Sequence, residues 1–185
     1  IVFQKKGFAG ARMQEIADEA GINKAMLHYC FKNKQLLFEA IFMNAFGQLA
    51  PQINEIFNSQ DTVFDKIKKF TSSYVSFVIE NPFLPQFIIQ ELYNNPDFAK
   101  SFLNNKNKPD PTFLFTQIEK EIEDGILKPI NPKQLLLDIF SMNAFPFAAQ
   151  TMVRGIIGIS EEEFFRMMEE RKTHIAEQII NSIRK

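Results

Sequence analysis

Four side chains within six residues could bind DNA if they lie on one helix. They are Lys24, Met26, His28 and Tyr29. A cation, an apolar group, an imidazole and a phenol can together contact phosphates and base edges in a DNA groove. In the same helix Leu27 and Phe31 are four residues apart and so point together toward the opposite side. The pattern therefore predicts a short helix with one face in a protein core and the other face free for nucleic acid.

A second short helix and a tight turn are predicted directly before this segment. Ala17 and Ala20 are small enough to let two helices cross closely, and Ile16 lies on the same inner face. Gly21 makes the turn, because glycine adopts left-handed backbone at little cost, and Asn23 is expected to cap the next helix. Two helices joined in this way form a helix-turn-helix, whose second helix enters the major groove.

A longer pattern surrounds the helix-turn-helix between about residues 3 and 46. It consists of Gly7-Phe8, Ile16-Ala17, Ala20-Gly21-Ile22-Asn23-Lys24, Leu27, Tyr29, Phe31-Lys32-Asn33-Lys34 and Leu36-Leu37. This segment resembles the DNA-binding head of TetR-type (tetracycline-repressor-like) transcriptional regulators. The resemblance is specific because the helix-turn-helix is followed at once by Phe, a short turn, Lys and a long helix. Beyond residue 46 only the length and the number of helices are similar.

The resemblance implies a homodimer that binds double-stranded operator DNA and a helical body with a pocket for a small-molecule effector. It places Lys34 at the phosphate-contacting start of the fourth helix, and Arg12 where family members often have a capping Thr or Ser. The residues assigned to DNA binding are Arg12, Asn23, Lys24, Met26, His28, Tyr29, Lys32 and Lys34. Ala25, Met26, His28 and Cys30 differ from the usual family residues, so no operator sequence is transferred.

Composition argues against several other classes of protein. The chain of 185 residues has 21 Lys and Arg against 22 Asp and Glu, which is not the strongly basic balance of a general nucleic-acid coat protein. Residues 1–46 hold six basic and four acidic side chains, so the head is mildly basic. No apolar run approaches the roughly 18 residues of a membrane span. One cysteine allows no disulfide within the chain, which favours a cytoplasmic location.

Catalytic patterns are not found either. The two histidines are far apart, the seven glycines are scattered, and no metal-ligand spacing or phosphate-binding loop occurs. We therefore expect no enzyme activity, no cofactor and no metal.

Apolar residues recur at spacings of three and four along the whole chain, which predicts an all-α fold of about nine helices. A three-helix head over residues 1–46 is expected to precede a ligand-binding and dimerisation domain over residues 47–185. The chain starts in mid-pattern at Ile1, so we expect an apparently truncated first helix that ends at Gly7. The later helices are expected over residues 13–20, 24–31, 34–57, 62–80, 83–94, 97–103, 112–124, 131–153 and 160–185.

Of the 21 phenylalanines, 15 lie in the expected body. Bulky apolar residues on helix 62–80 and on short, proline-bounded helices predict a cavity for an apolar or amphiphilic molecule, because ligand pockets are mostly apolar with few polar groups. The residues expected to line it are Phe64, Phe70, Tyr74, Phe77, Phe87, Gln90, Tyr93, Phe113, Asn143 and Phe147.

Residues 135–149 have a single charge, at Asp138. A helix that is apolar on nearly all sides must be covered on both faces, and a second copy of the chain is the simplest cover for the outer face. We expect a four-helix dimer interface from about residues 133–153 and 161–183. Its expected contacts are Ile139, Phe140, Met152, Phe165, Met168, Ile175, Ile179 and Ile183.

The leading hypothesis is a ligand-responsive transcriptional repressor that a small apolar or amphiphilic molecule releases from its operator. One alternative is a helical carrier of small molecules or lipids that retains the helix-turn-helix as a scaffold. Another is a regulator tuned by a protein partner, for which a filled core without a cavity is expected.

Overall fold

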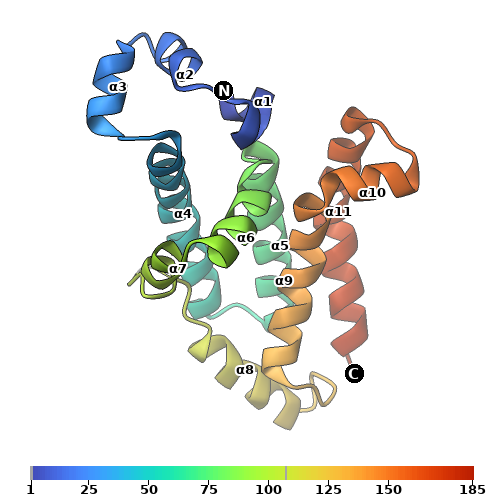
Figure 1. The fold of residues 1–185 in the computed structure, drawn as a ribbon. Coiled ribbons are helices and arrows are strands. Elements are labelled where there is room, and N and C mark those ends of the chain that lie inside the picture. Colours follow the sequence, from blue (N-terminus) through green and yellow to red (C-terminus); the bar gives the residue numbers. More distant parts are fainter. Residues whose placement is uncertain (1, 107) are drawn as a thin grey trace.

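The computed structural model describes residues 2–106 and 108–185, which form eleven helices (Figure 1). Ile1 of the expected first helix and Asn107, between the helices expected over 97–103 and 112–124, lie outside these residues. No strand occurs in the described ranges, where the one isolated bridge pairs Leu127 with Arg184, so the all-α prediction is confirmed. The helices are α1 Val2–Gly10, α2 Met13–Glu19, α3 Lys24–Cys30, α4 Lys34–Asn58, α5 Val63–Glu80, α6 Leu84–Asn94, α7 Pro96–Leu103, α8 Thr112–Glu123, α9 Pro132–Ala148, α10 Gln150–Ile157 and α11 Glu161–Ile183.

Capping side chains set the starts of four helices where the sequence predicts them. The cap oxygens of Asn23, Thr62, Asn131 and Ser160 accept backbone N–H groups two or three residues later, at 2.8, 3.2, 2.9 and 3.2 Å. Each bond satisfies an N–H that has no partner inside its helix. The predicted starts of α3, α5, α9 and α11 are therefore confirmed.

The segment 131–153, expected as one helix, is two. α9 ends at Ala148, the backbone leaves helical geometry at Ala149 (φ −110°, ψ 27°), and α10 starts at the next residue. One turn earlier Pro146 lacks the N–H that would bond to the carbonyl of Met142. Arg171 of α11 donates to that carbonyl instead, from Nη2 at 3.0 Å and Nε at 3.4 Å. The proline thus weakens α9 just before the break and supplies an acceptor that ties α9 to α11.

Two hydrophobic clusters meet along α4. The head cluster joins α1–α3 and the first half of α4 to α6 and α7, and the body core joins the second half of α4 to α5, α8, α9 and α11. Figure 1 shows α4 running from the helix-turn-helix down into the body. The buried residues of α4 in the head cluster are Leu37, Phe38, Phe42 and Ala45, and those in the body core are Leu49, Ile53, Ile56 and Phe57.

Pro51 lies inside α4 near the point where the two clusters meet. It has no N–H to donate to the carbonyl of Gly47, four residues earlier. Glycine itself disfavours helix by about 1 kcal/mol relative to alanine. This turn of α4 therefore lacks one backbone hydrogen bond and also contains a helix-destabilising residue.

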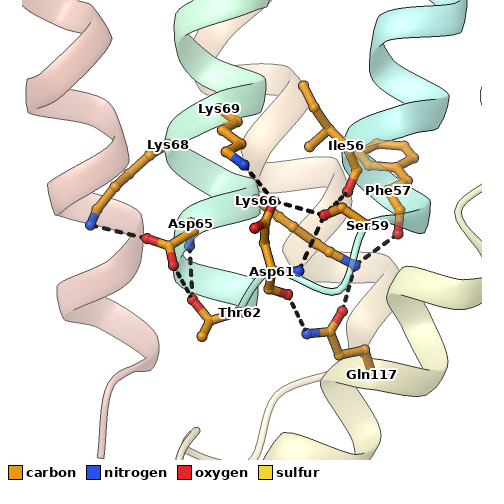
Figure 2. Close-up of polar contacts among 10 residues, drawn as sticks. All are labelled: Ile56, Phe57, Ser59, Asp61, Thr62, Asp65, Lys66, Lys68, Lys69 and Gln117. Atoms are coloured by element: carbon orange, nitrogen blue, oxygen red, sulfur yellow. Dashed lines mark hydrogen bonds and ion pairs between the residues drawn. The ribbon is translucent and has the colours of Figure 1, made fainter.

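A buried lysine fixes the corner between α4 and α5 (Figure 2). Lys66 is 2% exposed; its Nζ donates to the carbonyl of Phe57 at 2.9 Å and to the side-chain oxygen of Gln117. The Phe57 carbonyl is in the last turn of α4 and has no partner within that helix. The ammonium also lies 4.7 Å from the ring centroid of Phe113. Burial lowers the pKa of Lys66 despite the nearby carboxylates of Asp61 and Glu121.

No helix of the described residues is both long enough and apolar enough to cross a membrane.

Replacement of Lys66 by methionine keeps the side-chain length but removes the donor to the Phe57 carbonyl. We expect Lys66→Met to lower the free energy of unfolding by about 1–3 kcal/mol, because a buried acceptor loses its partner. Urea denaturation followed by circular dichroism measures the change. The matched control is Lys68→Met on the same helix, whose exposed ion pair with Asp65 (3.5 Å) is worth less than about 1 kcal/mol. Equal losses in the two variants would contradict the assigned role of Lys66.

Candidate nucleic-acid interface and pocket

The turn between α2 and α3 fixes the direction of α3. Gly21 has φ 67°, a left-handed conformation that glycine adopts at little cost. The N–H of Ile22 then donates to the carbonyl of Ala17 at 3.0 Å. Ala17 is fully buried and Leu27 of α3 is 4% exposed, so the two helices cross through small and apolar side chains.

The opposite side of α3 is open to solvent. Tyr29 is 90% exposed and Met26 58%, and Lys24 and His28 are exposed as well. The imidazole Nδ1 of His28 lies 3.4 Å from the carbonyl oxygen of Lys32. This face brings a cation, a phenol, an imidazole and a thioether together on a helix at the outer edge of the molecule (Figure 1), and those groups can contact phosphates and base edges.

Three other expected DNA-binding residues lie beside this face. Arg12 and Lys32 are exposed, before α2 and after α3. The Arg12 side chain caps no backbone group of α2, so an exposed guanidinium stands where the resemblance leads one to expect a cap. Asn23 is exposed, and its side-chain oxygen accepts a hydrogen bond from the N–H of Ala25. Its side-chain NH₂ group remains for a ligand.

The structure corrects the expected role of Lys34. Its Nζ donates to the carbonyls of Phe8 at 2.7 Å, Ala9 at 3.3 Å and Ala11 at 3.0 Å, and it lies 4.6 Å from the Phe8 ring centroid. An ammonium has three N–H donors, so none remains for a phosphate. Lys34 instead ties the start of α4 to the end of α1, whose terminal carbonyls have no helical partners.

An apolar cavity of about 160 Å³ lies in the body beside α4, walled mainly by α4, α5 and α6. Of the expected pocket residues, the structure places Phe70, Tyr74 and Phe77 on its wall. Burial raises the pKa of the Tyr74 phenol to about 12. The sequence analysis missed the contribution of α4, although its spacing of three and four could have shown it: Phe42, Phe46, Leu49, Ala50 and Ile53.

Four of the expected pocket phenylalanines lie elsewhere. Phe87 packs in the head cluster, where its ring centroid is 3.9 Å from that of Phe38. Leu84 and Ile88 of the same helix contact this cluster too, but they also line the cavity, which Phe87 does not. The other three pack outside the cavity, namely Phe64 against Arg184, Phe113 against Lys66 and Phe147 against Phe164.

The three expected polar anchors besides Tyr74 also lie away from the cavity wall. Tyr93 is 87% exposed, and Gln90 borders a separate groove between α1 and α6. Asn143 is fully buried between α9 and α5, where it donates to the carbonyl of Ile139 at 2.7 Å and to Thr71 Oγ1 at 3.4 Å. Its amide nitrogen therefore joins two helices, and its buried Oδ1 has no hydrogen-bond partner among the described residues.

The expected dimer surface is also corrected. Five of its residues are at most 5% exposed because they pack against their own chain: Ile139, Met168, Ile175, Ile179 and Ile183. Phe140 and Phe165 are half-buried, and Met152 is 50% exposed. The exposed apolar side chains lie on the opposite face of α9 and on α10; we call them the α9–α10 face. They are Leu137, Met142, Phe145, Met152, Ile156 and Ile157.

A polar cluster joins the first turns of α4 to α6 and α7. The amide of Gln35 donates to Glu39 at 3.0 Å and to Glu91. The amide of Asn95 donates to the same two carboxylates, at 3.0 and 3.4 Å. Glu91 is only 7% exposed, so its burial depends on these two amides. The cluster lies between the helix-turn-helix and the cavity.

Residues 1–41 match the family model described as bacterial regulatory proteins, tetR family. The chain is 24% identical over 185 residues to the HTH-type transcriptional regulator RutR of Escherichia coli K12, covering 98% of this chain and 85% of the relative. The ketosteroid transcriptional regulator KstR2 of Mycobacterium tuberculosis has a similar fold (TM-score 0.69, 15% identity, 100% and 90% coverage). So does FadR of Bacillus subtilis, solved with stearoyl-CoA (TM-score 0.62, 17% identity, 97% and 92% coverage).

Lys34 is bonded to three carbonyls, whereas Lys24 is exposed, so the two lysines should differ in their contribution to stability. We expect Lys34→Met to lower the free energy of unfolding by about 2–4 kcal/mol, since three carbonyls lose a charged donor. Lys24→Ala should change it by less than about 0.5 kcal/mol, as an exposed substitution does. Urea denaturation of the purified variants measures both values. A Lys34→Met protein as stable as wild type would refute the structural role.

Proposed function

Because this chain is a DNA-binding transcriptional regulator of the TetR family, we propose that it represses transcription from an operator and that a small molecule releases it. The proposal depends on one observation above all: α4 carries the helix-turn-helix at one end and forms a wall of the apolar cavity farther along. We place this action in the cytoplasm, with residues 1–46 as the DNA-binding head and residues 47–185 as the ligand-binding and dimerisation domain.

The exposed face of α3 reads the operator in this proposal. Lys24 and Lys32 neutralise phosphates, while Met26, His28 and Tyr29 contact base edges, because their side chains are free of the core. Two heads in a dimer read half-sites about 34–36 Å apart, one turn of DNA. Lys34 acts indirectly, since its bonds to the end of α1 hold the head against α4.

The ligand acts on the heads through α4. A molecule in the cavity contacts α4 on both sides of Pro51, at the turn that lacks the Gly47 hydrogen bond. If it prefers a different tilt of this helix, it changes the separation of the heads and weakens DNA binding. The ligand can shift the equilibrium between the two arrangements by no more than its differential affinity for them. A coupling of about 1–3 kcal/mol suffices for regulation. The FadR structure with stearoyl-CoA supports a ligand site in this fold.

The polar cluster of Gln35, Glu39, Glu91 and Asn95 resists this change of tilt. A shift of the first turns of α4 against α6 breaks the two hydrogen bonds that cross between these elements, from Gln35 to the buried Glu91 and from Asn95 to Glu39. We assign it the role of holding the DNA-binding arrangement in the absence of ligand.

A second copy of the chain covers the α9–α10 face. Leu137, Ser141 and Phe145 are four residues apart and exposed on one side of α9, which gives a self-complementary stripe across a two-fold axis. This face replaces most of the contacts expected from the sequence.

Operator binding tests the regulator function. In a gel shift on the DNA that flanks its own gene, we expect a sequence-specific complex. Tyr29→Ala should weaken it about 10- to 100-fold, the value of a good base contact. Lys24→Ala should lower the slope of log affinity against log salt by about 1, the value of one phosphate contact. Lys68→Ala, remote from the head, is the control.

If the wild-type protein forms no sequence-specific complex, the regulator function fails. A protein that binds small molecules tightly without any response to DNA would instead support the carrier interpretation.

The dimer is tested by a charge at the centre of the α9–α10 face. Phe145→Glu brings like charges together across a two-fold axis, which costs several kcal/mol, so we expect the dimer dissociation constant to rise at least about 100-fold. Sedimentation velocity measures it. The control is Leu103→Glu on α7, because Leu103 is 58% exposed and Phe145 55%. A dimer that survives Phe145→Glu but not Leu103→Glu would place the interface elsewhere.

A further inference from the structure

The wall of the cavity beside α4 has an unusual chemistry. Fifteen described residues line it, and Tyr74 is the only one whose side chain has a polar group. The rest are phenylalanine, aliphatic residues and proline. Specificity in apolar pockets comes from such isolated polar groups, so Tyr74 is the residue that can select one ligand over another of the same shape.

None of the described residues that line this wall is a cation. Lys108, next to the lining Pro109, donates its ammonium to the carbonyl of Leu103 at 2.9 Å. Lys66 is the buried lysine on the same helix as Tyr74, but its ammonium bonds to Phe57 and Gln117 on the far side of Phe70 and borders a different, water-sized void. Lys34 is held by three carbonyls at the other end of α4. A carboxylate or phosphate inside the cavity would therefore lose its hydration without gaining a counter-charge, at large cost.

The hydroxyl of Tyr74 is available to a ligand. The ring stacks on Phe70 with centroids 5.8 Å apart, which fixes its position. Among the described residues no group hydrogen-bonds to the hydroxyl. A tyrosine phenol is protonated at neutral pH, so this hydroxyl can donate one hydrogen bond.

The volume limits the size of the occupant. The cavity of about 160 Å³ is close to the engineered apolar cavity of about 150 Å³ that stays dry and binds benzene. One substituted ring fills this volume, whereas most of a long acyl chain would have to extend beyond it.

We infer that the cavity binds an uncharged molecule of about the size of a substituted benzene ring, with one carbonyl, ether or hydroxyl oxygen that accepts a hydrogen bond from Tyr74. The inference deepens the proposed function by naming the class of effector, and only its effect on DNA rests on that function.

Three probes of nearly equal shape test it. Each is a benzene ring with one substituent carbon, and that carbon bears two methyl groups in cumene, one oxygen and one methyl group in acetophenone, and two oxygens in benzoate. Isothermal titration with the full chain should show binding of acetophenone and cumene and none of benzoate. Tyr74→Phe should weaken acetophenone about 3- to 10-fold, the value of one neutral hydrogen bond, and leave cumene within two-fold. Ala50→Leu, which fills the cavity, should abolish binding of both.

Binding of benzoate as tight as that of acetophenone would overturn the inference, as would equal affinity of wild type and Tyr74→Phe for acetophenone, or no binding of acetophenone at all. Cumene binding by Tyr74→Phe reports that this variant retains an intact cavity. Operator binding measured with acetophenone at saturation is a separate readout. If acetophenone binds through Tyr74 but leaves the operator complex unchanged, the ligand inference stands and ligand-controlled repression fails.

Discussion

A single helix has to satisfy two hydrophobic clusters at once, and the rest of the structure depends on this constraint. The first half of α4 packs with the helix-turn-helix, and the second half packs with the body. Because each cluster includes buried side chains of α4, a movement of this helix displaces residues in both clusters. The head is therefore not a module on a flexible linker, and any change in the body that tilts α4 must reach the DNA-binding face.

Two lysines fix the ends of α4 by the same chemistry. Lys34 at its start binds the carbonyls of Phe8 at the end of α1 and of Ala11 just beyond it, and Lys66 of α5 binds the free carbonyl of Phe57 at its end. Both ammonium groups satisfy acceptors that helix geometry leaves unpaired. With both ends held, the turn at Gly47 and Pro51 is the place where α4 can bend, and the cavity lies beside that turn.

Local features were predictable from the sequence, and features that depend on helix orientation were not. Caps such as Asn23 and Ser160 act within three residues, so the starts of their helices could be read directly. The contacts of Lys34 join residues 23 to 26 positions apart in the sequence, so no local pattern could predict them. The expected phosphate contact of Lys34 came only from its position in the family resemblance. The rotation of α6 about its axis decides that Ile88 lines the cavity as well as contacting the head cluster, whereas Phe87 packs in the head cluster alone. An apolar stripe on α11 likewise cannot reveal whether its own chain or a partner covers it.

A ligand in the cavity beside α4 would also affect how much of the protein a cell retains. An occupant stabilises the folded state by mass action, and unfolded chains are the ones that cellular proteases remove. The molecule that detaches this protein from DNA would thus also prolong its life, so that the pool of regulator is largest when it is least bound and rebinding is rapid once the molecule is gone.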